Sequence, residues 1–300
     1  MSLSHDLEAL ALRLGISLSR TLGPIRASNA GGRVMRALGP MLAASRTADL
    51  NLRLALPALS DAERRAVISG VWENFGRTAA ELPHIGSLEC CPRGPGWELT
   101  GMEHIDAVRE QGGPAIFFSA HLANWELIGP AVAARGVHMG GFYRAPSNSQ
   151  ADAIIHGLRR EARPDGQVPM FAKGAVGGRE AIAHLAAGGF LGMMMDQKMN
   201  DGIAVEFFGR AAMTAPALAR FALRFACPVI PIHVERLGPA RFRVVCEAPL
   251  AAPTADDRTE YIHEMTRAVN RTMEQWIRAE PQSWLWLHRR WPQHAATGVH

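Results

Sequence analysis

The sequence predicts an α/β fold in which a mainly parallel sheet is flanked by helices, with a helical N-terminal part. After residue 96, short apolar runs of strand length alternate with segments of helical periodicity, as in parallel strands joined by crossover helices. The apolar runs are largely continuous, which is typical of strands buried on both faces. A hydrophobic fraction of 48% and a charged fraction of 20% are sufficient for a sizeable core.

The first 85 residues read as helical throughout. Near the N-terminus, apolar residues recur every three or four positions: Leu7, Leu10, Leu14, Leu18, Leu22 and Ile25. They form one helical stripe, and Arg13 and Arg20 lie off it. Two interpretations remain open. The stripe packs on the protein's own core, or residues 4–26 form a helix that lies in a membrane interface with its Arg heads toward lipid phosphates. No apolar stretch is long enough to predict a membrane span.

A second helical signal starts at Ser60, because Ser60-Asp61-Ala62-Glu63 has the capping-box pattern. We expect a long helix from there toward Pro83. The Pro/Gly-rich break at Cys91–Gly96 then divides the chain into a helical part, 1–90, and an α/β part, 91–300. Whether the two parts form separate units or one compact unit is left open by the sequence.

Within the second part we expect strands and helices in alternation. The predicted strands are Ala115–Ser119, Met139–Tyr143, Phe190–Met195, Pro228–Val234 and Phe242–Cys246. The predicted helices are Trp125–Arg135, Asp152–Arg163, Arg179–Ala187, Ala215–Phe225 and Asp257–Glu280.

The composition also narrows the class of function. The net charge of +4 suits an anionic partner such as a phospholipid headgroup, an acidic carrier protein or a phosphorylated substrate. No basic stripe with interleaved aromatic residues occurs, so nucleic acid is not an expected partner. The four cysteines do not have metal-ligand spacing, and we expect them to be reduced structural thiols.

Polar residues follow three of the predicted strands where each strand ends: His121, Arg144 and Asp196. Because ligand sites in open parallel sheets form beyond the carboxyl ends of the strands, we expect these residues to converge. His121 and Glu126 are five residues apart, which in a continuous helix would place them about 140° apart. They can meet only through a turn, and Asn124 is a suitable N-cap for one. Glu126 would then orient His121, which would take a proton from an attacking hydroxyl.

The run from His121 to Glu126, His-Leu-Ala-Asn-Trp-Glu, resembles the His-(four residues)-Asp/Glu motif of the lysophospholipid/glycerolipid acyltransferase superfamily. It most resembles the bacterial lipid A biosynthesis (lauroyl/myristoyl) acyltransferase family. Four further blocks of that family follow in order: Phe142–Asn148; Asp196-Gln197 with Val205–Gly209 and Ala212–Thr214; Pro228–Pro231; and Pro281–Trp291. The likeness covers roughly residues 45–292, and five motifs in order are far more specific than one.

The resemblance implies a glycerolipid acyltransferase-like fold and an O-acyltransferase, with no metal, no other cofactor and no acyl-enzyme. It implies acyl carrier protein or acyl-CoA as donor, and a hydroxyl of a phosphorylated glucosamine lipid, a lipid A precursor, as acceptor. The catalytic residues expected are His121 and Glu126. The residues expected to bind substrate are Asn124, Arg144, Asn148, Asp196, Gln197, Phe208, Gly209 and Thr214. Such an enzyme of lipopolysaccharide biosynthesis would work at the cytoplasmic face of the bacterial inner membrane, peripheral or monotopic.

Three alternatives remain open. The acceptor could instead be a lysophospholipid, an ornithine lipid or a glycolipid, since the segment Arg163–Gly178 departs from the usual family pattern. A second alternative is thioester or ester hydrolysis with Ser119 as nucleophile, although no Gly-x-Ser-x-Gly elbow is present. The third is a membrane-binding module without catalysis. The C-terminal Trp284, Trp286 and Trp291 are expected to dock on the domain rather than to lie in a membrane interface.

Overall fold

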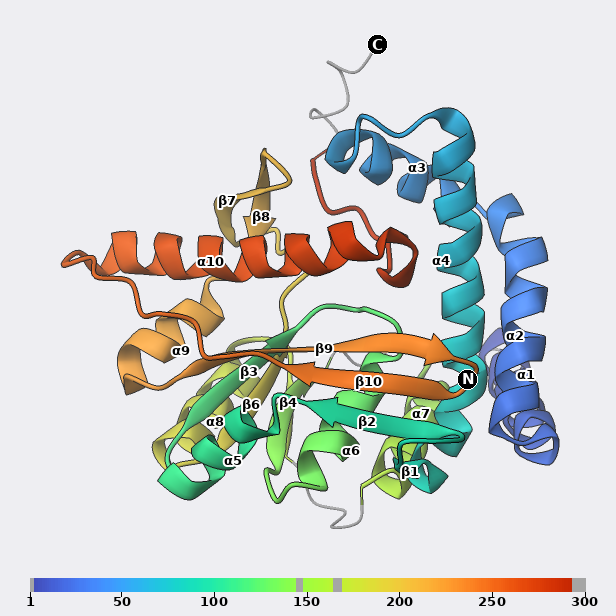
Figure 1. Cartoon of the computed structure of the whole chain (residues 1–300), viewed down its shortest axis with the longest axis horizontal. Coiled ribbons are helices and arrows are strands. Elements are labelled where there is room, and N and C mark those ends of the chain that lie inside the picture. The colour runs from blue at the N-terminus through green and yellow to red at the C-terminus, as the bar shows by residue number, and fades with distance from the viewer. Residues whose placement is uncertain (1–2, 144–147, 164–168, 293–300) are drawn as a thin grey trace.

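A computed structural model describes residues 3–143, 148–163 and 169–292. Its centre is an eight-stranded sheet with the order β1-β2-β10-β9-β3-β6-β4-β5 (Figure 1). Six of the seven neighbouring pairs are parallel, and only β9 and β10 run antiparallel. Helices cover the sheet, so the predicted α/β class with a mainly parallel sheet is confirmed.

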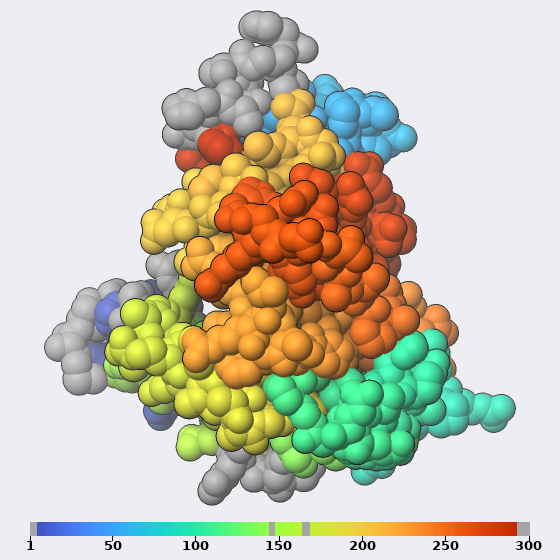
Figure 2. All heavy atoms as spheres, turned by 90° about the vertical axis from the view of Figure 1, so that its left-hand side faces the viewer, coloured from blue at the N-terminus to red at the C-terminus, as the bar shows by residue number. Residues whose placement is uncertain are grey.

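The strands of the sheet are β1 (Glu89–Cys90), β2 (Gly96–Thr100), β3 (Ala115–Ser119), β4 (Met139–Tyr143), β5 (Met170–Ala172), β6 (Phe190–Met194), β9 (Val229–Gly238) and β10 (Arg241–Cys246). All five predicted strands are present. The sequence did not reveal β1, β2 and β5, which are short or only partly apolar. It also did not reveal the separate hairpin of β7 (Ile203–Phe207) and β8 (Arg210–Thr214). Figure 1 and Figure 2 show this hairpin above α10, on the side of that helix away from α9.

The α-helices are α1 (Leu3–Leu22), α2 (Pro24–Leu38), α3 (Ala44–Ala55), α4 (Asp61–Glu81), α5 (Met102–Gln111), α6 (Ile128–Ala133), α7 (Ser149–Glu161), α8 (Ala175–Ala186), α9 (Ala217–Phe225) and α10 (Arg258–Ala279). Short 3₁₀ turns add η1 (Gly39–Met41), η2 (Leu82–Ser87), η3 (Trp125–Leu127) and η4 (Pro281–Ser283). The predicted helices are all found, except that Trp125–Arg135 divides into η3 and the shorter α6.

Strand β3 lies between two cores. Ile116 and Phe118 belong to one cluster together with buried residues of α8, α9 and α10. Ala115 and Phe117 point to the opposite face and pack with residues of α5 and α6. Because side chains alternate along a strand, a strand with both faces covered needs an unbroken apolar run. This explains why the sequence located β3 correctly.

The N-terminal helices pack on the same structure. The capping box at Ser60 is formed, with the Ser60 N–H donating to Glu63 at 2.7 Å and Ser60 Oγ accepting from the Glu63 N–H at 3.3 Å. Helix α2 lies directly on α4, because a Cβ at Gly31 or Gly76 would overlap the backbone of the other helix. Trp72 of α4 belongs to the core cluster that contains Phe118. The break at Cys91–Gly96 connects β1 with its partner β2 at one edge of the sheet.

The leucine stripe of α1 points away from the protein. Leu7, Leu10, Leu14 and Leu18 are 54–62% exposed, whereas Ala9 and Ser19 on the other side of the helix are buried. The interpretation that the stripe packs on the protein's own core is therefore wrong. In the described part of the chain, no helix combines the length and the apolar character that a membrane crossing requires.

Candidate active site

His121 and Asp196 meet at the carboxyl edge of the sheet. His121 follows β3 by two residues, and Asp196 follows β6, which is the neighbour of β3 in parallel register. The Nδ1 atom of His121 lies 2.8 Å from Oδ1 of Asp196, and the backbone N–H of His121 donates to Oδ2 at 3.1 Å. One carboxylate thus holds both the ring and the main chain of the histidine.

Asp196 is buried and remains ionised. Its exposed fraction is 3%, and its Oδ2 also accepts the indole N–H of Trp284 at 2.7 Å. Burial would raise the pKa of the carboxyl. The adjacent His121 and the hydrogen bonds from His121 and Trp284 outweigh it and lower the pKa of Asp196 to about 2. Because Asp196 only accepts, Nδ1 of His121 must carry the proton, and Nε2 retains its lone pair.

The electrostatics favour proton uptake by His121. Burial works to lower its pKa, but the Asp196 carboxylate outweighs burial and raises the pKa above its ordinary value. Glu126 raises this pKa further, and Arg159 opposes it. The side chain is still 17% exposed, and its ring meets that of Trp125 edge-on with centroids 5.0 Å apart. These features are those of an oriented general base with a reachable lone pair.

The expected hydrogen bond between His121 and Glu126 is not formed, and this part of the prediction requires correction. Glu126 instead accepts two hydrogen bonds from Arg159 of α7, at 2.9 and 2.6 Å. Asn124 does not cap the following turn through its side chain, and residues 125–127 form a 3₁₀ turn rather than the first turn of an α-helix. The Glu126 carboxylate therefore pairs with the Arg159 guanidinium, and Asp196 is the hydrogen-bond partner of His121 Nδ1.

Two asparagines expected to bind substrate bond to other parts of the chain. Asn124 is fully buried, and its Nδ2 donates to Glu81 at 2.9 Å. Asn148 caps α7 by accepting from the N–H groups of Gln150 and Ala151. Its Nδ2 donates to Glu8 of α1 at 3.0 Å. Both asparagine side chains thus connect the surroundings of the site to the N-terminal helices α4 and α1.

The remaining expected residues lie on the β6 and β7–β8 side. Gln197 is partly exposed next to Asp196. Phe208 and Gly209 form the hairpin turn, with φ angles of 55° and 70°, and the Phe208 N–H donates to Glu274 of α10 at 2.6 Å. Thr214 is fully buried and accepts from Arg290 at 2.7 Å. Arg144 lies outside the described residues.

Sequence reasoning missed Arg159 and the polar role of Trp284. Trp284, Trp286 and Trp291 are all buried, so the expected docking of the C-terminal segment is confirmed. The segment also forms part of the site, since Leu122 bridges to Trp284 and the Leu285 N–H donates to the His121 carbonyl at 3.1 Å. The sequence indicated only aromatic anchors, because nothing in a local pattern places an indole against a carboxylate 88 residues away.

Ser119 is not positioned as a nucleophile activated by His121. Its side chain is buried, and its hydroxyl donates to the Ala120 carbonyl at 3.3 Å. The His121 nitrogen nearest the main chain is taken by Asp196. The site therefore lacks the hydrogen bond between nucleophile and base that hydrolysis through Ser119 would need.

Comparison with known proteins identifies the family of the chain. Residues 11–293 match the model of the family described as bacterial lipid A biosynthesis acyltransferase. Lipid A biosynthesis acyltransferase 1 of Shigella flexneri is 26% identical over 257 residues, covering 81% of this chain and 73% of that protein. The lipid A biosynthesis myristoyltransferase of Escherichia coli K12 is 25% identical with the same coverage.

Among solved structures, the chain is similar to the 1-acyl-sn-glycerophosphate acyltransferase of Thermotoga maritima. The TM-score is 0.37 and the sequence identity 13%, over 90% of this chain and 98% of that one. The match to the family model extends over nearly the whole chain and includes His121, Glu126 and Asp196. The chain belongs to the bacterial lipid A biosynthesis acyltransferase family, and it is an acyltransferase.

Proposed function

We propose that the protein moves a fatty acyl chain from acyl carrier protein, or from acyl-CoA, to a hydroxyl of a lipid A precursor, with His121 as general base. The observation that carries this proposal is the hydrogen bond of 2.8 Å between His121 Nδ1 and Asp196. It leaves Nε2 as the acceptor for the proton of the substrate hydroxyl. Asp196 takes the orienting role that the sequence suggested for Glu126.

The reaction needs one proton to move twice. As the acceptor oxygen attacks the thioester carbonyl, its proton passes to Nε2 of His121, and a C–O bond forms. The C–S bond then breaks, and the imidazolium returns the proton to the leaving thiolate, so the histidine ends neutral. Asp196 stabilises the intervening imidazolium, because its own pKa of about 2 keeps it ionised throughout.

Glu126 and Arg159 have a supporting role in this proposal. Glu126 holds the Arg159 guanidinium through two hydrogen bonds and adds negative potential at His121. Arg144 and Gln197 remain proposed contacts for the phosphate and hydroxyl groups of the acceptor. Asn124 and Asn148 are proposed to act indirectly, since their side chains bind Glu81 and Glu8.

The names of the relatives support lipid A as the acceptor. The identity of 25–26% to them is low enough that a lysophospholipid, an ornithine lipid or a glycolipid is retained as the second candidate. Either acceptor resides in a membrane. The exposed leucines of α1 continue into exposed Ile25, Val34 and Leu38 of α2, which supports attachment to a membrane surface. We propose the cytoplasmic face of the inner membrane, where acyl carrier protein is available.

The test is mass spectrometry of lipids after the protein meets acyl carrier protein loaded with mixed acyl chains. A lipid A precursor and a lysophospholipid are offered together, and H121A is the control. A mass gain on the lipid A precursor that H121A lacks is expected. A gain on the lysophospholipid alone would change the acceptor. Free fatty acid with neither lipid modified, or equal activity of H121A, would overturn the proposal.

A further inference from the structure

The loop that carries His121 is held in an unusual conformation two residues further on. Ala123 has a φ of 47°, in the left-handed region that non-glycine residues rarely adopt. Its N–H donates to the Ser283 carbonyl at 2.9 Å. Its carbonyl accepts from Asn74 at 3.2 Å and from Thr78 at 2.8 Å. Such a conformation persists only where surrounding contacts determine it, and here they come from α4 and the C-terminal segment.

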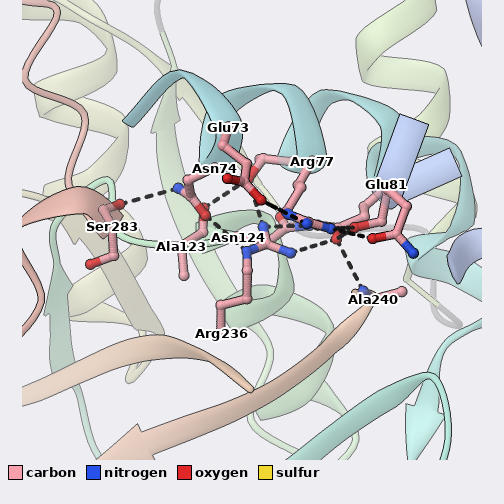
Figure 3. A network of polar contacts seen from close by, with 12 residues as sticks. Glu73, Asn74, Arg77, Glu81, Ala123, Asn124, Arg236, Ala240 and Ser283 are labelled. Carbon is pink, nitrogen blue, oxygen red and sulfur yellow. Dashed lines mark hydrogen bonds and ion pairs between the residues drawn. The ribbon is translucent and has the colours of Figure 1, made fainter. Parts of the chain in front are cut away.

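Three side chains on one face of α4 bind the loop at Ala123 and at the next residue, Asn124. Asn74, Thr78 and Glu81 follow each other at helical spacing, and Figure 3 shows Asn74 and Glu81 on the side of α4 that faces the loop. Asn74 and Thr78 bind the Ala123 carbonyl, while Glu81 accepts from Asn124 at 2.9 Å. This face of α4 is therefore hydrogen-bonded to two consecutive residues of the loop.

Arg236 of β9 binds all three of these side chains at once. Its Nε donates to Asn74 Oδ1 at 2.9 Å, and its Nη2 to Thr78 Oγ1 at 3.2 Å. Its Nη1 and Nη2 also donate to the two oxygens of Glu81, at 2.5 and 3.0 Å. In Figure 3 the guanidinium lies between α4 and the strand that carries it. The side chain of Arg236 is 12% exposed and that of Glu81 is fully buried.

The Arg236 guanidinium and the Glu81 carboxylate together fix the direction of the hydrogen bonds in this set. Arginine only donates, so Asn74 must turn its oxygen to Arg236 and its NH₂ group to the Ala123 carbonyl. Thr78 accepts from Arg236, and its single hydroxyl hydrogen is left for the same carbonyl. Glu81 only accepts, so Asn124 must present its NH₂ group to it.

We infer that Arg236 is a positioning residue for catalysis, which sets the polarity of the α4 face and through it fixes the loop that aims His121. The inference rests on the proposed role of His121 as base. The path from Arg236 to the base is short, because Ala123 and Asn124 follow His121 directly after Leu122. The Leu285 N–H also donates to the His121 carbonyl, at 3.1 Å. A shift of the loop would change the hydrogen bond between His121 and Asp196.

Conservative variants can test this with only small changes in side-chain size. N74D keeps the oxygen that faces Arg236 but replaces the donor to the Ala123 carbonyl by a second acceptor. T78V removes the hydroxyl, and T78S restores it. R236K keeps the charge but cannot reach three acceptors in the fixed directions of a fork. We expect N74D, T78V and R236K to lower kcat by about tenfold to a hundredfold, since misplacement on the order of 1 Å has such effects.

Two readouts separate positioning from simple stability. The KM for the acyl donor should remain that of the wild type in the folded variants, and T78S should recover most of the turnover that T78V loses. The acidic limb of the kcat–pH profile should move to lower pH, because a looser contact with Asp196 raises the pKa of His121 less. Thermal unfolding gives the folded fraction, to which each kcat is normalised.

The matched control is R243K on the adjacent strand β10. Arg243 also binds two carboxylates, Glu98 at 2.7 Å and Glu235 at 3.1 Å, but its strand register with Glu235 places it on the face of β9 and β10 opposite to Arg236. Its kcat should equal that of the wild type. If H121A is inactive while N74D, T78V and R236K keep full kcat, this inference is overturned and the proposed function stands. If H121A is itself active, the proposed function fails first.

Discussion

Trp284 donates its indole N–H to the buried Asp196 carboxylate at 2.7 Å, while the same carboxylate holds the ring of His121. The C-terminal segment therefore forms one wall of the site next to α4, since Asn74 of α4 donates to the Ser283 carbonyl at 3.2 Å. A hydrogen bond to a charged group contributes more to stability than one to a neutral group, on the order of 1.5–3 kcal/mol. This makes Trp284 part of the arrangement that keeps Asp196 ionised.

The variant W284F removes the N–H and keeps most of the ring. We expect the free energy of unfolding, measured in urea at pH 7, to fall by about 1–3 kcal/mol, and kcat to fall as well. W286F is the control, because Trp286 is equally buried in the same segment but donates to the Pro281 carbonyl. It should lose stability with little change in kcat. Equal losses of kcat in both variants would show that Trp284 acts only through packing.

The pH dependence of the reaction should report the pair of His121 and Asp196. The charged and titratable groups that act on His121 are Asp196, Glu126, Arg159 and His288. Since the pKa of His121 is raised, its basic form is lost as pH falls through that raised value, and kcat/KM should increase with pH.

In D196N the carboxylate that raises the pKa is gone, so this acidic limb should shift to lower pH. The plateau should also drop, by on the order of 10²–10⁴, because the neutral amide no longer fixes the tautomer. An acidic limb that stays in place in D196N would mean that another group titrates. The profile is measured with acyl carrier protein as donor at saturating acceptor.

Variants of Glu126 and Asp196 can distinguish which of the two carboxylates orients His121. Glu126 binds Arg159 and acts on His121 only electrostatically, without a hydrogen bond. E126Q should therefore lower kcat less than D196N does. R159Q should lower kcat by a similar factor to E126Q, and the double variant E126Q/R159Q should add little to either loss. A loss in E126Q that exceeds the loss in D196N would restore the pairing that the sequence suggested. Single-turnover rates of the four variants decide between the two.

The sequence predicted the ends of β3 and β4 correctly because both are short, largely apolar runs; β3 is buried along its whole length and β4 at its first two residues. It also predicted that His121 and Asp196 lie near one edge, since both follow a strand. It did not predict that they bind each other, because that depends on β6 lying next to β3, a neighbour relation across more than 70 residues.

The same dependence on distant segments explains why the sequence wrongly paired Glu126 with His121. Its partner Arg159 comes from α7, and spacing within the motif carries no information about that helix. The φ of 47° at Ala123 was equally invisible, because alanine is not a residue that indicates a left-handed turn. Local patterns thus located the chemical groups, and the strand order and the surrounding helices decided their pairing.

The outward stripe of α1 predicts binding to anionic phospholipid vesicles, measured by co-sedimentation. Leu14 and Leu18 are each 62% exposed, and burying one leucine in a lipid interface contributes about 1.5–3 kcal/mol. L14D or L18D should therefore weaken binding by about tenfold or more, while acyl transfer to a detergent-solubilised acceptor stays near the wild-type rate. The control is V176D, because Val176 is 58% exposed on α8, far along the chain from the stripe. Its binding should not change, and equal binding by L14D and the wild type would reject the stripe as the membrane contact.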